Sequence, residues 1–477
     1  MRNTLVGLLT AVSMVAVSAC SAGGTGGRSA AGNGEGEAVV PPAQAGNAAN
    51  PPTVQETIGQ PSTTEKKTVV FSTFFPSEFL NEAKRKYEAK HPNITIDLRY
   101  VDSDNKHLEE NLEKFVKTTG TAMLSGKGPD LLEMDQLPSG SYVGKKLLAN
   151  LGDLMDKDPS FRKENYFSNV LDGMKVNGGI YGMPIGFILY GFMGNKTLIE
   201  NSGVPFDDSG WTWSEFAGVA KELAKKADPD HKFALGGMPP EYMLANFVNA
   251  QYATFIDQPN RRANFESAAF SDLLQQVKSL YDARLVNEQA RFSIFRETTI
   301  VSPSDYIREI RQSEFMPNKM DYKSKLYVMP HADGQKPGSF FRTYQTIGLN
   351  EKSAVKAEAW DFLKFLLSDE VQAKADGAGF PLNKASYQNK VQALLQKGKV
   401  ESDQPIGPMK GQSFDITQND IDDLDKFVNG AIYPVQFKPS KIDEIVREDS
   451  KAYFTGQKTP EAVAKLIQNR ITTVLNE

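Results

Sequence analysis

The order of strand-like and helix-like segments between residues 68 and 134 constrains the fold more than any other feature of this chain. Residues 68–74 are a short β-prone apolar run, and apolar and polar residues alternate over 94–100, which predicts two strands. A helix is expected after Ser77, which can cap it, and a second helix over 106–124 leads into the apolar run 130–134. Strand, helix, strand, helix and strand in this order predict an α/β fold with a largely parallel sheet.

Ligands of such sheets bind beyond the carboxyl ends of the strands, because the loops that follow the strands gather there. The first predicted strand ends at Thr73, Phe74 and Phe75, and the third ends at Asp135 and Gln136. These residues are therefore the first candidates for a binding site.

Cys20 is the only cysteine in 477 residues, so no disulfide can form within the chain and a large core must stabilise it. The length of the chain is enough for such a core and suggests two lobes. The net charge of −5 gives no basic surface for nucleic acid. The four histidines are far apart, so we expect neither a metal site nor a cofactor.

The position of Cys20 indicates the cellular location of the protein. It directly follows an apolar run over residues 5–17 with Arg2 ahead of it, a pattern typical of a secretory signal peptide over residues 1–19. The run is shorter than the ~20 apolar residues of a spanning helix. Residues 17–20 resemble a bacterial lipobox, although Val17 replaces the commoner Leu, and this resemblance implies lipidation of Cys20 and anchoring on the extracellular face of the cell membrane. The alternative is an ordinary signal peptide with Cys20 as a free thiol.

Residues 21–66 contain no aromatic residue and are rich in small and polar residues. They cannot bury enough apolar surface to fold, so we interpret residues 20–66 as a lipidated cysteine with a disordered tether. A flexible coil of this length spans roughly 40 Å root-mean-square.

Several short motifs then follow one another in a fixed order. They are a Gly-Pro-Asp strand entry, a Gly-x-Ile-Tyr-Gly-Met-Pro passage, a Thr-Trp-x-Glu-Phe helix start, an Ala-x-x-Phe-Leu-x-Phe-Leu helix and a Gly-x-Pro loop, at residues 128–132, 178–184, 212–216, 359–368 and 379–381. In this order they resemble the family 1 extracellular solute-binding proteins of ABC importers, the group that includes the maltose-binding protein. The resemblance covers about residues 67–477.

This resemblance implies a type II periplasmic-binding-protein fold, in which two α/β lobes are joined by crossing strands and enclose a ligand. We expect lobe 1 at residues 67–187 and 325–372, and lobe 2 at 188–324 and 373–477. The resemblance also implies a monomer that binds a small solute and passes it to permease subunits of an ABC transporter, with no enzymatic activity and with the lipid as its only attachment to a membrane.

The family resemblance further implies contacts to the ligand, most of them aromatic or polar side chains that suit sugars, because ring faces stack on sugar C–H groups while hydroxyls need hydrogen bonds. The implied residues are Thr73, Phe74, Phe75, Asp135, Gln136, Phe187, Tyr190, Glu241, Tyr242, Ser304, Asp305, Phe341, Arg342 and Tyr344. Ser304 and Asp305 stand where relatives often have Gly-x-Trp, which favours a smaller or more polar ligand than a malto-oligosaccharide. Phe74 can equally be a core residue, and Trp211, Trp213 and Trp360 are expected in the core or at a helix start.

Two other classes of function remain open from the sequence. A two-lobe surface lipoprotein could act as an adhesin or present a ligand to a sensor, and an exported glycosidase would need two facing carboxylates. The chain has no Gly-x-Ser-x-Gly, Walker or dinucleotide-binding motif after a strand.

Overall fold

The computed structural model of the chain describes residues 61, 64–103, 106–228, 232–290, 292–315, 322–373, 379–435 and 441–476. The predicted signal peptide, Cys20 and nearly all of the predicted tether lie outside these residues. No helix within these ranges combines the length and the apolar character needed to cross a bilayer.

Three parallel strands form the N-terminal part of the main sheet. β1 (Lys67–Ser72) lies between β2 (Ile94–Arg99) and β3 (Leu131–Glu133) and is parallel to both. Helix α1 (Glu78–Lys90) joins β1 to β2, and its N-cap Ser77 accepts a hydrogen bond from the backbone of Leu80. Helix α2 (Leu108–Ser125) joins β2 to β3. The α/β order predicted for this part of the chain is confirmed.

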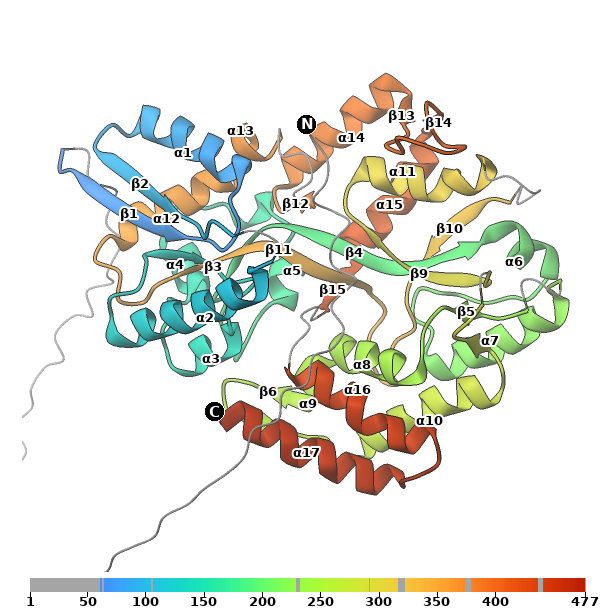
Figure 1. Cartoon of the computed structure of the whole chain (residues 1–477). Helices are drawn as coiled ribbons and strands as arrows, with labels where there is room; N and C mark the ends of the chain where they lie inside the picture. Colours follow the sequence, from blue (N-terminus) through green and yellow to red (C-terminus); the bar gives the residue numbers. More distant parts are fainter. Residues whose placement is uncertain are drawn as a thin grey trace, which may run out of the picture. The chain divides into compact units, whose positions relative to one another are not determined.

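Two long antiparallel strands continue the sheet. β4 (Met183–Asn195) pairs with β11 (Ser339–Leu349), and β11 also pairs with β3, which gives the order β10-β4-β11-β3-β1-β2 (Figure 1). Four short strands complete this sheet: β9 (Phe295–Ile300), β10 (Ser324–Tyr327) and β12 (Phe380–Pro381) pair with β4, and β15 (Ala431–Pro434) pairs with β11.

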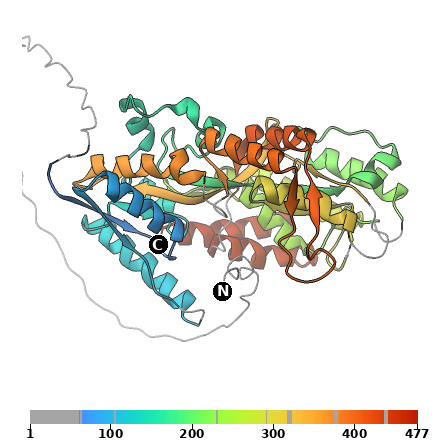
Figure 2. The same ribbon diagram turned by 90° about the horizontal axis from the view of Figure 1, so that it is seen from above.

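The other elements flank this sheet. The helices are α3 (Ser139–Gly144), α4 (Leu151–Lys157), α5 (Ser168–Gly173), α6 (Lys196–Ser202), α7 (Trp213–Lys226), α8 (Pro240–Ala250), α9 (Tyr252–Phe255), α10 (Ala268–Asp282), α11 (Pro303–Arg311), α12 (Lys356–Leu366), α13 (Asp369–Gln372), α14 (Lys384–Lys397), α15 (Gln418–Gly430), α16 (Lys441–Phe454) and α17 (Pro460–Asn476), with 3-10 turns at Lys163–Asn165 and Gln312–Phe315. Small two-stranded sheets pair β5 (Leu235–Gly236) with β8 (Val286–Asn287), β6 (Ile256–Asp257) with β7 (Arg262–Ala263), and β13 (Lys399–Glu401) with β14 (Ser413–Asp415). Figure 2 shows the blue and cyan N-terminal elements at one end of the main sheet and the green α6 and α7 at the other.

The buried apolar residues form three clusters. The sheet core joins β1, β4 and β11 to α1, α12, α14 and α15 and includes Phe71, Phe187, Phe341, Trp360 and Tyr387. The α8 core joins α7, α8, α10, α16 and α17 and includes Phe216, Phe247, Phe270, Phe295 and Ile467. The α3 core lies between α2, β3 and α3 and includes Phe74, Phe115, Leu132, Met134 and Tyr142.

The sheet core contains residues from all four segments of the predicted lobes. Phe71 and Phe362 come from predicted lobe 1, whereas Ile307, Phe380 and Leu424 come from predicted lobe 2. The sheet core therefore extends across the predicted lobe boundary, and the exact division into lobes stays a prediction.

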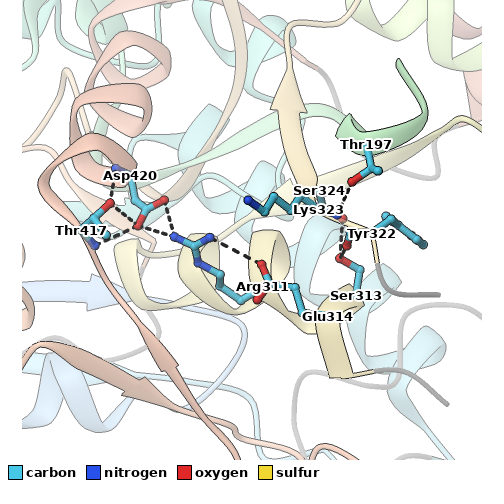
Figure 3. Close-up of polar contacts among 9 residues, drawn as sticks. All are labelled: Thr197, Arg311, Ser313, Glu314, Tyr322, Lys323, Ser324, Thr417 and Asp420. Atoms are coloured by element: carbon cyan, nitrogen blue, oxygen red, sulfur yellow. Dashed lines mark hydrogen bonds and ion pairs between the residues drawn. The ribbon is translucent and has the colours of Figure 1, made fainter. Parts of the chain in front are cut away.

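A polar clamp fixes two helices of the sheet core to each other (Figure 3). The Arg311 guanidinium of α11 donates through Nη2 to both carboxylate oxygens of Asp420 on α15, at 2.8 and 2.7 Å. Asp420 also closes a capping box with Thr417 at the start of α15. One carboxylate thus caps a helix and holds its neighbour, and the two-point geometry makes this ion pair directional.

The three tryptophans are core residues, as expected. None is more than 4% exposed, and the indole N–H groups of Trp211 and Trp360 donate to the Val328 carbonyl and the Asp158 carboxylate. Trp213 opens α7 behind the N-cap Thr212. These indoles therefore serve packing and leave no ring face for a ligand.

Candidate functional site

The carboxyl end of β1 offers one side chain to solvent. Thr73 is 1% exposed and its hydroxyl donates to the Phe75 carbonyl at 2.9 Å, while Phe74 packs in the α3 core at 2% exposure. Phe75 is 42% exposed and contacts Phe74 edge-to-face at 4.7 Å between ring centroids. Of the three predicted contacts at this strand end, only the Phe75 ring is available for stacking, whereas Thr73 and Phe74 hold it in place.

The end of β3 is fastened to β11 by Asp135. Its two carboxylate oxygens accept the backbone N–H groups of Gln345 at 2.8 Å and Thr346 at 3.1 Å. Gln345 has a φ of +47°, which is unfavourable for a residue with a side chain, so these hydrogen bonds stabilise a strained turn of the backbone. Asp135 is therefore a positioning residue. Gln136, beside it, is half-buried.

Gln345 is a feature of this strand end that sequence reasoning missed. Its amide nitrogen lies 3.4 Å from the Ser77 hydroxyl, and its amide oxygen is buried without a hydrogen-bond partner among the described residues. An unsatisfied buried acceptor costs about 1–3 kcal/mol, which adds to the backbone strain at this residue.

A row of polar side chains continues from this strand end along the antiparallel strands β11 and β4. Arg342 and Tyr344 of β11 stand opposite Ile188 and Gly186 of β4, and Tyr190 stands opposite Phe340. Burial raises the pKa of Tyr344, the charges of Glu133 and Asp135 raise it further, and the Arg342 guanidinium opposes both. Burial also raises the pKa of Tyr190, again against the charge of Arg342. The three half-buried side chains Tyr190, Arg342 and Tyr344 therefore lie close enough to interact electrostatically, and their contact with a ligand stays a prediction.

Glu297 on β9 extends the row toward the α8 core, and sequence reasoning did not select it. Asn246 of α8 donates through Nδ2 to its carboxyl oxygen at 3.2 Å, and the charge of Glu297 adds to the raised pKa of Tyr190. Burial raises the pKa of Glu297 to about 7, against the lowering effect of the Asn246 hydrogen bond. A carboxyl group that is largely neutral below pH 7 can both donate and accept hydrogen bonds.

The start of α8 presents a second exposed aromatic ring. Tyr242 is 44% exposed, and the Arg447 guanidinium of α16 lies 4.7 Å from its ring centroid. Arg447 is held in turn by Asp443 at 2.9 Å, and Glu241 lies 3.8 Å from Lys451. One side of the Tyr242 ring is covered by a cation and much of the rest is open, which suits stacking on an apolar ligand face.

Four of the predicted contacts lie elsewhere. Phe187 and Phe341 have no exposed surface and pack edge-to-face in the sheet core, so neither side chain can touch a ligand in this structure. Asp305 accepts the backbone N–H of Val301 at 2.9 Å beside the N-cap Ser302, which makes it a helix-capping residue of α11. Ser304 lies in the same first turn. Phe187 and Phe341 are therefore corrected to core residues, whereas a ligand contact of Ser304 or Asp305 stays a prediction.

No group of three potential metal ligands exists among the residues that the structure describes. The candidate site thus combines aromatic, amide, guanidinium and carboxyl groups near the end of β3 and on β11, β4, β9 and α8 with the exposed rings of Phe75 and Tyr242. Such a set can bind a polar organic solute by stacking and hydrogen bonds.

The fold and this site define a solute-binding protein. Residues 74–373 match the family model of the bacterial extracellular solute-binding proteins, and the chain belongs to this family. The family resemblance inferred from the motifs is thereby confirmed.

Known proteins agree with this assignment. A protein of Brucella abortus strain 2308, described only as a binding protein, is 21% identical over 359 residues, which cover 72% of this chain and 83% of that protein. The sugar-binding protein MalE of Xanthomonas citri has a similar fold, with a TM-score of 0.57 at 16% identity over 86% of this chain and 98% of its own. The cyclic α-maltosyl-1,6-maltose binding protein of Arthrobacter globiformis gives a TM-score of 0.54 at 14% identity over 86% and 99%. The two-lobe binding-protein fold is therefore confirmed.

Proposed function

We propose that this protein is the lipid-anchored, extracellular substrate-binding component of an ABC importer, and that it captures a carbohydrate and delivers it to a permease without chemical conversion. The observation that carries the proposal is the combination of two exposed aromatic rings, Phe75 and Tyr242, with the polar row between β3 and α8.

The chemistry of the row favours a sugar over an amino acid or a metal. A sugar ring has apolar C–H faces for Phe75 and Tyr242 and several hydroxyls that donate and accept hydrogen bonds. Glu297, Asn246 and Arg342 offer acceptors and donors for those hydroxyls. Two of the structurally similar proteins are named for binding sugars, which supports the same class of solute here.

A thermal-shift screen with mono- and oligosaccharides, polyols and amino acids tests the capture of a solute. A ligand at 100 times its Kd stabilises the native state by about 2.7 kcal/mol, which raises the melting temperature measurably. The double variant Phe75→Ala/Tyr242→Ala should melt at the wild-type temperature without ligand and lose the shift with it. If no compound of the panel shifts the wild type, the proposed function is wrong. Conversion of the solute to a product during the assay would indicate an enzyme instead.

The membrane anchor is a separate part of the proposal and rests on residues 17–20 of the sequence. Cys20→Ser should release an intact, ligand-binding protein into the medium, because the acylated thiol is then absent. Ser21→Ala, next to it, should remain with the membrane fraction. A Cys20→Ser protein that stayed membrane-bound would refute the lipid anchor and leave the binding function untouched.

A further inference from the structure

Two glycines of the short helix α3 make an unusually close contact with the turn between β6 and β7. A Cβ atom at Gly140 would lie 2.1 Å from Oε1 and 2.4 Å from Cβ of Gln258, and a Cβ atom at Gly144 would lie 2.5 Å from the carbonyl oxygen of Pro259. Real Cβ atoms essentially never come closer than 3.0 Å to such atoms. Only glycine at both positions allows this approach.

The backbone conformation gives no other reason for these glycines. Both have helical, negative φ values, which every residue adopts, and glycine disfavours a helix relative to alanine. Four residues apart, Gly140 and Gly144 lie on the same face of α3. That face is therefore shaped for the Gln258–Pro259 turn at the expense of the stability of the helix itself.

The two contacting segments are each firmly held, but by different cores. Tyr142 of α3 is buried in the α3 core. The turn follows Phe255 and Ile256, which are buried in the α8 core, and Gln468 of α17 binds the backbone of Phe265 and Ala263 just beyond it. Figure 1 shows the yellow-green loop next to β6 reaching toward α3.

The turn itself is stiff. Asp257 accepts hydrogen bonds from the backbone and the side chain of Asn260, at 3.2 and 2.8 Å. Two rigid surfaces on separate cores thus meet. The α3 core also holds the Phe74 that supports Phe75, and the α8 core holds the helix that carries Tyr242.

We propose that Gly140 and Gly144 form a latch with Gln258 and Pro259 that holds the α3 core and the α8 core together without help from a ligand. Since a ligand between the two cores then meets a protein that is already closed, the latch raises the affinity of the site. This inference concerns the conformation of the chain and does not depend on the identity of the solute.

The latch predicts a defined response to single methyl groups. Gly140→Ala and Gly144→Ala each put a Cβ into occupied space, which should reduce the closed population roughly tenfold. Gly218→Ala in the middle of α7 is the matched control, because that glycine is also helical but no atom lies within 4 Å of the place that its Cβ would take. The three atoms nearest to a Cβ at Gly140 all belong to the Gln258 side chain, so Gln258→Gly in the same chain should restore closure.

Single-molecule energy transfer on the ligand-free protein measures this directly. In the Cys20→Ser mature chain, dyes on Lys127→Cys after α2 and Lys458→Cys between α16 and α17 report the distance between the two cores, and both positions are exposed. The high-transfer population should dominate in the parent and in Gly218→Ala, shrink in Gly140→Ala and Gly144→Ala, and return in Gly140→Ala/Gln258→Gly. Unchanged distributions in the alanine variants would overturn the latch, as would a failure of the rescue. Because no ligand is added, this outcome is independent of the saccharide screen.

Discussion

The carboxyl group of Glu297 makes a testable link between pH and stability. In the unfolded chain its pKa has the ordinary value of 4.5, whereas burial raises it to about 7 in the folded protein. The folded state therefore binds more protons than the unfolded state between these two values. Stability falls as pH rises through this window, and the full loss is reached above pH 7.

The size of the effect follows from the two pKa values. At 1.36 kcal/mol for each tenfold change in the proton equilibrium, the difference between 4.5 and about 7 corresponds to about 3 kcal/mol. This value is an upper limit, because Glu297 is partly exposed and water stabilises some of its charge. It is still a large fraction of the 5–15 kcal/mol that is typical of folded domains.

The nearby groups do not titrate in the same window. Burial raises the pKa of Tyr190 and of Tyr281 above the ordinary tyrosine value of 10, far from this window. Glu297→Gln keeps the shape and the hydrogen bond from Asn246 but removes the ionisation. The difference between wild type and this variant therefore isolates the Glu297 charge.

Urea unfolding at a series of pH values from 4 to 8.5 provides the assay. Between pH 5 and pH 8 the wild type should lose up to about 3 kcal/mol of unfolding free energy relative to Glu297→Gln. Glu266→Gln, at an exposed position, is the control and should follow the wild type. If wild type and Glu297→Gln have the same pH dependence, the carboxyl group is not perturbed and the reasoning is refuted.

Two further predictions concern structural residues. Burial opposes the ionised form of Asp158, but hydrogen bonds from Lys364 and Trp360 outweigh it and hold the pKa of Asp158 well below its usual value of 3.8. Asp158→Asn should cost about 2 kcal/mol in urea unfolding at pH 7. In the wild type this contribution should shrink steadily as pH falls from 3.8 toward the lowered pKa of the folded state, so an equal cost at pH 2.5 would contradict it. Gly379 has a φ of +79°, and a Cβ there would lie 2.6 Å from a carbonyl oxygen of β4, so Gly379→Ala should destabilise by more than 1 kcal/mol. Gly398→Ala, with a similar φ of +72° but open space, should cost clearly less, and equal melting temperatures of the two variants would show that the contact does not matter.

The local features of the fold could be predicted from the sequence because they depend on neighbouring residues. The strands β1 to β3, the cap at Ser77 and the capping box at Thr212 follow from apolar periodicity and side-chain chemistry. The partners of Glu297 and Gln345 could not be predicted, because Asn246 and Asp135 are far away in the sequence and come close only in the folded chain. No local pattern distinguishes these residues from ordinary strand positions.

The errors at Phe187 and Phe341 have a geometric cause. Successive side chains of a strand point to opposite faces, so Phe187 cannot share a face with Tyr190, and Phe341 cannot share a face with Arg342. The two side chains of each of these pairs therefore cannot contact the same ligand on one face of the sheet. Which member faces the sheet core is decided by the helices that pack there, and aromatic residues alone do not reveal it.

The pairing of β11 with β3 has a consequence for how the protein folds. Ile347 stands opposite Glu133, and β4 and β15 pair with β11 in turn, so the centre of the sheet is built from segments that are far apart in the chain. Contacts of such long sequence separation slow folding, because large loops must close before the contacts form. The β3 edge of the N-terminal β1–β3 unit stays unpaired until β11 has been synthesised and has paired with it. For a chain that crosses a membrane unfolded, such slow folding would be an advantage, because the sheet could form only after most of the chain had crossed.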